Sequence, residues 1–245
     1  MKKIIYIFKN GLLQNIVIGI YFITLLVECY LQFYRYYSLR IYTRPPLMIL
    51  LFMVFFQQFI SRNHLYILGA MICACVADYL IITYYVLYQW TGVGLYALSF
   101  ILLALQFFQL EYFTFKTSKL ALFISLMGLI IYIATKEYFA STHDLLLSKK
   151  PLTYAYAASL AVLCTAVLNI YFNNKQFNFK FAITAFLLLL IANISFDCSI
   201  YIFHRKQTWP DSLCGFCYGL SYFLMIRGLL RAKDKIMGNE YFQSI

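Results

Sequence analysis

Long hydrophobic runs dominate this 245-residue chain and decide what it can fold into. A helix needs about 20 apolar residues to cross the hydrocarbon core of a bilayer. Hydrophobic residues make up 63% of the chain and charged residues 12%, against about 45–50% and about 25% in soluble domains. We therefore expect an all-α, polytopic membrane helix bundle. Its eight transmembrane helices are expected at 12–33, 46–60, 65–88, 92–110, 119–138, 152–172, 180–203 and 212–231.

The segments between these runs are too short to hold a water-soluble domain, so residues 1–245 are expected to form a single transmembrane domain. Prolines stand where helices begin: Pro45 and Pro46 open the second run, and Pro151 opens the sixth. Proline suits the first turn of a helix, where its missing N–H is no loss. The first run has span length and lacks an A-x-A cleavage site, so we expect it to remain as a helix.

The net charge of +11 comes from Lys and Arg that lie mostly between the runs. Such residues are typical of interfacial anchors and of topology determinants, and we expect a bilayer partner and no nucleic acid. With the N-terminus inside, twelve Lys and Arg fall on the inner side and eight on the outer side. This bias favours both termini in the cytoplasm of a multi-pass integral membrane protein, in the inner membrane if the source is a bacterium.

Cysteine and histidine patterns give little support to redox or metal chemistry. Most of the seven cysteines lie within or at the ends of apolar runs, where they behave as small hydrophobes. Cys214 and Cys217 have C-x-x-C spacing, but no βαβ pattern accompanies them. The histidines, His64, His143 and His204, stand in loops or at run ends, whereas a zinc site needs a cluster of ligands. We expect no metal and no cofactor.

Three acidic residues, Glu28, Asp78 and Asp197, lie inside hydrophobic runs. An acid at membrane depth is costly and by default marks a functional site that faces the protein interior. The three occupy the first, third and seventh runs, which share one direction, and each stands roughly 14 to 18 residues from its run's start at about 1.5 Å per residue. We expect similar depths for all three, and an internal cavity across which Asp78 and Asp197 face each other.

Arg44 lies just before the second run, on the same side as the three acids, where a guanidinium is placed to bind a phosphate. The acids also admit a purely structural interpretation. A buried carboxyl can simply hydrogen-bond a neighbouring helix, and Glu28 can reach outward to the interface. Both interpretations remain open at this point.

The segments that hold these residues also resemble a known family. Residues 43–48, TRPPLM, resemble the T-K-P-L-x-M opening of the second span in lysoplasmalogenases, the YhhN-like membrane proteins. Residues 68–80, LGAMICACVADYL, resemble that family's L-G-L-x-F-S-x-x-G-D-x-x-L helix. Residues 94–99, GLYALS, are similar to its G-x-x-A-F-x-x-A-H segment, and residues 194–198, ISFDC, to its F-x-x-S-D-S motif. Residues 218–228 keep the spacing of its closing Y-x-x-A-Q-x-x-I-x-x-G. The similarity covers most of the chain at low identity, and eight spans is the count expected of the family.

The resemblance implies hydrolysis of the vinyl ether bond of a lysoplasmalogen, a lysophospholipid-type single-chain lipid. It supports catalytic roles for Asp78 and Asp197, and together with the depth of the acids it leads us to expect substrate contacts from the following residues: Arg44, Glu28, Ser99, Tyr218 and Tyr222. The chain also departs from the family pattern. Ala77 replaces a glycine, Arg44 a lysine and Tyr222 a glutamine, and the family's histidine falls near Ser99 or Phe100.

Two carboxyls suit vinyl ether chemistry. A carboxylic acid protonates the outer alkenyl carbon, and a carboxylate stabilises the oxocarbenium ion and activates water, as in glycoside hydrolysis. Burial in an apolar bundle favours a protonated carboxyl, so both roles can coexist. Asp78 and Asp197 are the expected pair, without an assignment of which is the acid. The alternative function is a proton-coupled transporter or a lipid-binding membrane protein without hydrolytic activity.

Overall fold

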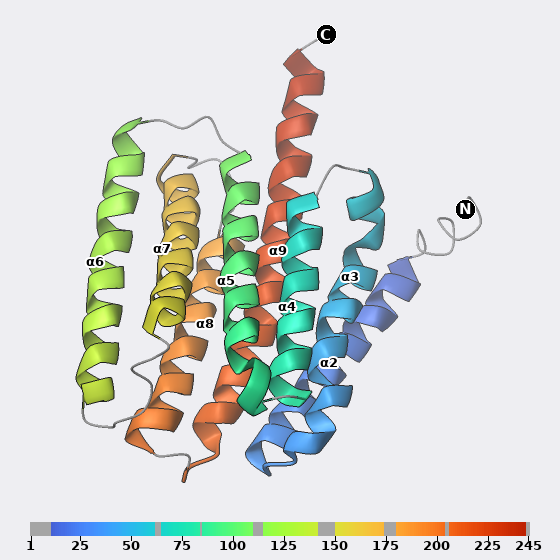
Figure 1. Ribbon diagram of the computed structural model, residues 1–245. Coiled ribbons are helices and arrows are strands. Elements are labelled where there is room, and N and C mark those ends of the chain that lie inside the picture. The colour runs from blue at the N-terminus through green and yellow to red at the C-terminus, as the bar shows by residue number, and fades with distance from the viewer. Residues whose placement is uncertain are drawn as a thin grey trace.

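The computed structural model describes residues 11–61, 65–83, 85–109, 115–141, 150–173, 180–203 and 206–243, and within these ranges it is helical with no strand. The elements follow in chain order (Figure 1): α2 (Gly11–Phe33), the 3-10 helix η1 (Tyr37–Tyr42), α3 (Arg44–Ser61), α4 (Leu65–Thr83), α5 (Tyr85–Gln109), α6 (Phe115–Ser141), α7 (Lys150–Asn173), α8 (Lys180–Asp197), the π-helical turn η3 (Cys198–Ile202) and α9 (Trp209–Gln243). The expected all-α bundle is confirmed.

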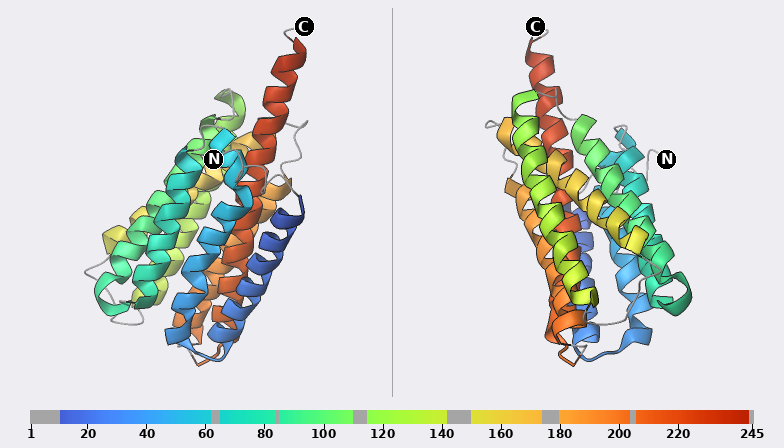
Figure 2. Two further views of the ribbon diagram at one scale, coloured as in Figure 1. Left: turned by 90° about the vertical axis from the view of Figure 1, so that its right-hand side faces the viewer. Right: turned by 60° about the vertical axis from the view of Figure 1, so that its left-hand side comes forward.

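Seven of these helices form a closed ring of neighbours. The order of packing is α2, α3, α4, α5, α7, α8 and α9, and α9 returns to α2. Helix α6 stands outside this ring against α7, at the edge of the bundle (Figures 1 and 2). One end of the ring holds η1, the start of α3, the start of α9 and the final turns of α2, α4 and α8. We call it the η1 end.

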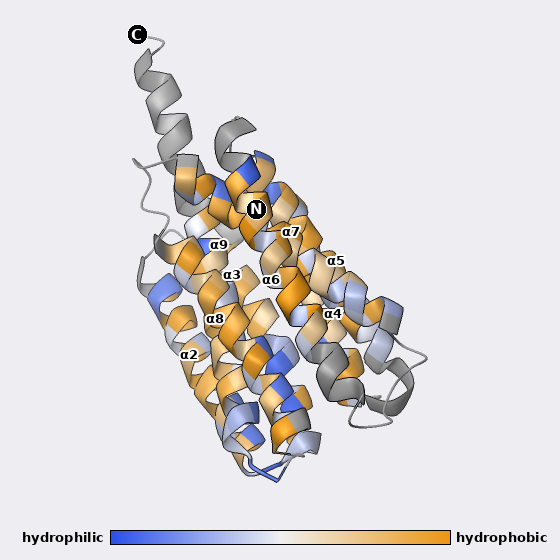
Figure 3. Cartoon of the chain, turned by 90° about the vertical axis from the view of Figure 1, so that its left-hand side faces the viewer, coloured by the Kyte–Doolittle hydropathy of each residue, from blue (hydrophilic) through white to orange (hydrophobic). Residues whose placement is uncertain are grey.

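Six of the described helices are long and apolar enough to cross a membrane: Leu13–Phe33, Tyr37–Phe55, Leu65–Thr83, Trp90–Gln109, Pro151–Phe172 and Trp209–Leu229. The apolar stretches Lys119–Thr135 and Phe181–Asp197 are shorter and do not reach that criterion. Hydrophobic residues prevail along the described helices (Figure 3), and many of the large ones are exposed. The chain is therefore a helical membrane bundle, in which the sequence-based count of eight spans is supported for six.

Several boundaries differ from those expected from the sequence. Residues 85–88 begin α5 and do not end the preceding helix, which stops at Thr83. The seventh expected span, 180–203, is an α-helix to Asp197 followed by the π-helical turn. Helix α9 begins at Trp209 and runs well beyond the expected 231. Hydropathy does not register the first two changes because apolar residues continue through both boundaries, and it misses the end of α9 because the helix continues into a polar segment.

Helix α4 shows how the sequence directs a polar residue inward. Its buried residues recur at three- and four-residue intervals: Ile67, Ala70, Met71, Ala74, Ala77 and Asp78. Small alanines on this face let the helix pack closely against its neighbours, as in many membrane helix interfaces. Asp78 continues the same face and is 1% exposed. The packing of α4 therefore places a carboxyl inside the bundle.

Gly92 sets the close approach of α5 to α4, and its replacement by alanine should weaken the bundle. A Cβ atom there would lie 2.5 Å from Cγ1 of Ile81 and 3.2 Å from the carbonyl oxygen of Ala77. We expect Gly92→Ala to lower the free energy of unfolding by about 1–3 kcal/mol, as overpacking does in other cores. Thermal unfolding in detergent, followed by circular dichroism, measures the change. Gly128→Ala on α6 is the control, since no atom lies within 4 Å of its added Cβ. Equal melting of the two variants would contradict the close approach.

Candidate functional site

Asp78 lies at the centre of a buried polar cluster near the η1 end. Its Oδ1 atom accepts a hydrogen bond from Nε of Arg44 at 2.6 Å. The hydroxyl of Tyr96, on α5, donates to the same oxygen. The other oxygen, Oδ2, is buried and has no hydrogen-bond partner among the described residues. A buried carboxylate oxygen without a donor is costly, so Oδ2 is the atom where water or a ligand is expected to bind.

Arg44 is positioned by the first turn of α3. The chain leaves η1 at Thr43. Helix α3 then starts at Arg44, and the two prolines follow as its next residues. The Arg44 side chain is 18% exposed, and its guanidinium carbon lies 5.1 Å from the centre of the Tyr218 ring. A planar guanidinium can hold a carboxylate and stack on an aromatic face at the same time. Arg44 therefore joins α3, α4 and α9 at one point.

Glu28 forms a second ion pair, with Arg40 of η1. Its Oε1 atom accepts from Nε2 of Gln32 at 2.7 Å and from Nε of Arg40 at 2.9 Å. Its Oε2 atom accepts from the hydroxyl of Thr43 at 2.5 Å. Three donors thus hold a carboxyl that is 1% exposed. The outward-reaching interpretation of Glu28 is wrong, because its donors all come from inside the protein.

Gln32 connects this ion pair to α9. Its Oε1 atom is buried and lacks a hydrogen-bond partner among the described residues. A Cβ atom at Gly215 would stand only 2.5 Å from it, so Gly215 leaves the room that the amide occupies. Gly215 is three residues before Tyr218 on the same helix, and residues three apart share a helix face. The unpartnered amide oxygen therefore faces the same side of α9 as the tyrosine under Arg44.

A row of hydroxyl side chains continues from Asp78 into the bundle. The rings of Tyr96 and Tyr218 meet edge to face at 5.5 Å, and those of Tyr218 and Tyr222 lie 4.8 Å apart. The hydroxyls of Tyr222 and Ser99 are 2.9 Å apart, and Ser99 donates to the carbonyl of Ala70. The sequence-derived residues Ser99, Tyr218 and Tyr222 therefore belong to one buried group with Asp78.

Asp197 lies apart from this cluster. It is the last residue of α8, is half-buried, and precedes the π-helical turn η3. Helices α4 and α8 are separated in the ring, and the polar contacts of Asp78 go to Arg44 and Tyr96. Asp197 interacts electrostatically with Tyr156 of α7, whose hydroxyl donates to Asn193 at 2.7 Å. The structure thus places both aspartates towards the η1 end but does not bring their carboxyls into contact.

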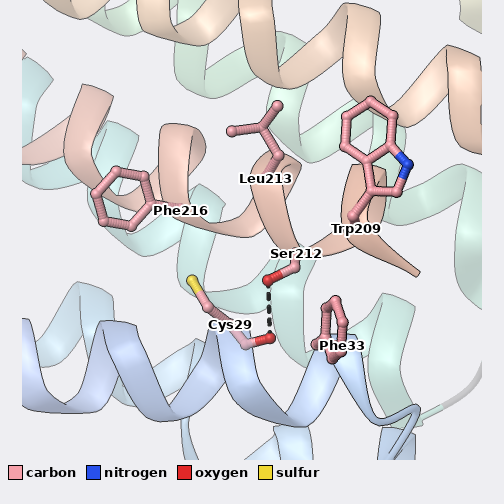
Figure 4. Close-up of a pocket in the computed structure, with 6 residues that line it drawn as sticks. All are labelled: Cys29, Phe33, Trp209, Ser212, Leu213 and Phe216. Atoms are coloured by element: carbon pink, nitrogen blue, oxygen red, sulfur yellow. Dashed lines mark hydrogen bonds between the residues drawn. The ribbon is translucent and has the colours of Figure 1, made fainter. Parts of the chain in front are cut away.

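The pocket found at this end is not the polar cavity expected between the acids. It has a volume of about 280 Å³ and lies between the end of α2 and the start of α9 (Figure 4). Its lining residues are mostly apolar: Cys29, Phe33, Trp209, Ser212, Leu213 and Phe216. Neither Asp78 nor Asp197 lines it. Around Asp78 itself, Arg44 of α3, Tyr96 of α5 and Tyr218 of α9 come together.

Metal chemistry has no ligand set in the described part of the chain. No group of three or more His, Cys, Asp and Glu side chains gathers there. The histidines His64, His143 and His204 lie outside the described residues. All seven cysteines are free thiols, Cys214 and Cys217 among them.

Sequence reasoning missed Tyr96, Arg40, Thr43 and Gln32. Arg40 and Thr43 belong to the segment around η1, which carries no hydrophobic periodicity, and Gln32 ends an apolar run. A usable pattern existed in the four-residue spacing of Glu28 and Gln32, which places this pair on one side of α2. Compared with known proteins, the chain matches no family model, no curated protein and no solved structure.

The Arg44–Asp78 pair should show strong energetic coupling. Arg44→Gln leaves a buried carboxyl without its cation, and we expect a loss of about 3–5 kcal/mol in unfolding free energy. Adding Asp78→Asn should recover part of this loss, because the uncompensated charge is then gone. Thermal unfolding of the two single variants and the double variant in detergent measures the coupling. Strictly additive losses would show that the two side chains do not depend on each other.

Proposed function

We propose that this protein is a lysoplasmalogenase-like hydrolase that cleaves a vinyl ether bond inside the membrane. The observation that carries the proposal is the Asp78 carboxyl. It is buried at the η1 end of the bundle, fixed on one oxygen by Arg44 and Tyr96, and unpartnered on the other. A carboxyl held in one orientation with one oxygen available is the arrangement that general acid–base catalysis needs.

The chemistry assigns a defined task to the available oxygen. A carboxylic acid transfers a proton to the outer alkenyl carbon, and the π electrons of the double bond form the new C–H bond. Water then adds to the oxocarbenium carbon and gives its proton to a carboxylate. The hemiacetal breaks its C–O bond and releases an aldehyde and a glycerophospho-alcohol. Because Oδ1 of Asp78 already accepts two hydrogen bonds, Oδ2 is the atom that exchanges protons in this scheme.

Asp197 remains the proposed second carboxyl. Its support is its position at the η1 end, beside a π-helical turn, a feature that is frequent at functional sites. The link to Asp78 would run through Tyr156 and the hydroxyl row that ends at Tyr222 and Ser99. In this proposal Glu28 and Tyr218 hold Arg40 and Arg44 in place, and Arg44 meets the lipid phosphate with the guanidinium nitrogens that Asp78 does not use.

A second function has support from the same hydroxyl row. Tyr96, Tyr218, Tyr222 and Ser99 lie beside a buried carboxyl, which is also an arrangement for moving protons through a membrane protein. A proton-coupled carrier would use Asp78 as its proton site and would cleave nothing. The two functions differ in whether a covalent bond of the lipid breaks.

Hydrolysis by the purified protein, with lysoplasmalogen and ordinary lysophospholipid as parallel substrates, tests the proposal. We expect Asp78→Asn and Asp197→Asn each to lower kcat by about 10²–10⁴-fold, the usual contribution of general acid–base catalysis. Asp211→Asn is the matched control, since Asp211 is an acid at the start of α9 outside the cluster. Size-exclusion profiles confirm that each variant is folded. Wild-type turnover in both aspartate variants would refute the carboxylate mechanism. Absence of hydrolysis together with a proton flux that both variants abolish would favour the carrier.

We further propose that all eight helices cross the bilayer and that both termini are cytoplasmic. Helix α6 has 27 residues and, at about 1.5 Å per residue, is long enough to span. Helix α8 is extended at its end by η3. A periplasmic- or lumenal-active reporter such as alkaline phosphatase, fused at Ile245, should be inactive, while a cytoplasmic fluorescent reporter should be active. The same fusions at Leu39, within η1, should give the opposite result. If the reporters place Leu39 and Ile245 on the same side of the membrane, the number of spans is not even.

A further inference from the structure

The shallow groove between α2 and α9 has no part in the proposed reaction. Cys29 and Phe33 line it from α2, and Trp209, Leu213 and Phe216 line it from α9 (Figure 4). The hydroxyl of Ser212 donates to the carbonyl of Cys29 at 2.9 Å, so it is satisfied within the protein. The groove therefore has a mostly apolar lining around a volume of about 280 Å³, suited to a hydrocarbon chain.

The groove lies at interfacial depth. It borders the last turn of α2 and the first turns of α9, and the segment that follows α2 carries exposed tyrosines: Tyr34, Tyr36, Tyr37 and Tyr42. Tyr and Trp collect where the bilayer meets water, since their rings are apolar and their tips are polar. Trp209 is 49% exposed at the groove itself. A chain lying in the groove would therefore carry its polar group at the headgroup level.

Two cations lie close in sequence to residues that line the groove. Arg35 follows Phe33 by two residues, and Lys206 precedes Trp209 by three; both are exposed. Nη2 of Arg35 donates to the carbonyl oxygen of Lys206 at 2.9 Å, which joins the two turns. Arg35 has φ 61°, a left-handed conformation that is uncommon for a residue other than glycine. The hydrogen bond thus holds the two charged turns together despite a backbone cost.

The other charges near this turn leave it positive. Arg40 is neutralised by Glu28, at 2.9 Å. Asp211 lies in the first turn of α9, where a carboxylate compensates the helix dipole. Arg35 and Lys206 therefore outnumber the one remaining acid among the described residues of this turn.

We propose that the α2–α9 groove binds an anionic phospholipid, with one acyl chain along the groove and the phosphate against Arg35 and Lys206. The occupant is a lipid and not a soluble anion, because the cations lie in the turns next to the helix ends that form an apolar groove, in a protein that is embedded in the bilayer. The site is separate from Asp78, and the inference does not depend on the proposed hydrolysis.

Fluorescence quenching of Trp209 by brominated lipids tests this site. The chain has two tryptophans, so Trp90→Phe leaves Trp209 as the single emitter. The protein is reconstituted in two vesicle preparations of identical phosphatidylcholine and phosphatidylglycerol content. In one the bromine is on the phosphatidylglycerol chains, and in the other it is on the phosphatidylcholine chains. The ratio of the two quenching efficiencies, corrected for lipid content, gives the local enrichment of the anionic lipid.

We expect phosphatidylglycerol to be enriched at Trp209, with each cation contributing roughly a five-fold preference. Arg35→Asn, which keeps a residue that tolerates the left-handed conformation, and Lys206→Gln should each lower the enrichment. Lys119→Gln, which removes an exposed charge from α6, should not. Trp209→Phe in the otherwise native protein should remove the part of the quenching that depends on the headgroup. This variant replaces the single-tryptophan measurement if Trp90→Phe fails to fold. Equal quenching by both lipids, or equal loss in the Lys119 variant, would overturn the proposal.

Discussion

The contact between Arg44 and Asp78 is the constraint on which this end of the bundle depends. A membrane interior has no water to solvate a lone carboxylate or guanidinium, so each charge must find its partner inside the protein. The 2.6 Å contact ties the first turn of α3 to the packed face of α4, and the Tyr218 ring under the guanidinium ties both to α9. The Glu28–Arg40 pair ties α2 to η1 in the same way. Without these pairs, four segments would lose the polar contacts that align them.

Much of the fold follows from hydropathy alone, and the reason is physical. Lipid requires long apolar helices, so the runs in the sequence locate the helices within a few residues. The same argument identifies Glu28 and Asp78 as interior residues, because an acid on the packed face of a membrane helix must meet a partner. The break between α4 and α5, the π-helical turn after Asp197 and the 3-10 helix η1 depend instead on local geometry, which apolar composition does not encode.

The candidate site was foreseeable in part. Depth along a helix can be counted, so the sequence correctly places the acids towards one end. Rotation around the bundle and the order of helices cannot be counted, and these decide which acids meet. Asp78 and Asp197 sit on α4 and α8, which are not neighbours in the ring, whereas Tyr96 reaches Asp78 because α5 packs along α4. A tyrosine in a chain with 23 tyrosines gives no sequence pattern that would single it out.

The pairing of both arginines changes what the η1 end can bind in its interior. Two guanidinium groups and two carboxyls make the buried cluster close to neutral, whereas an unpaired Arg44 would have drawn a free phosphate. The unpartnered buried atoms beside the two ion pairs are Oδ2 of Asp78 and Oε1 of Gln32, which accept hydrogen bonds, and the hydroxyl of Tyr218, which can donate or accept. A polar group that brings hydrogen-bond donors, such as water or a hydroxyl, therefore suits the two acceptors. A phosphate can accept from the Tyr218 hydroxyl and must share a guanidinium with a carboxyl. Surplus positive charge lies outside the cluster, at Arg35 and Lys206, so the buried site and the lipid-facing groove differ in the chemistry that each can recognise.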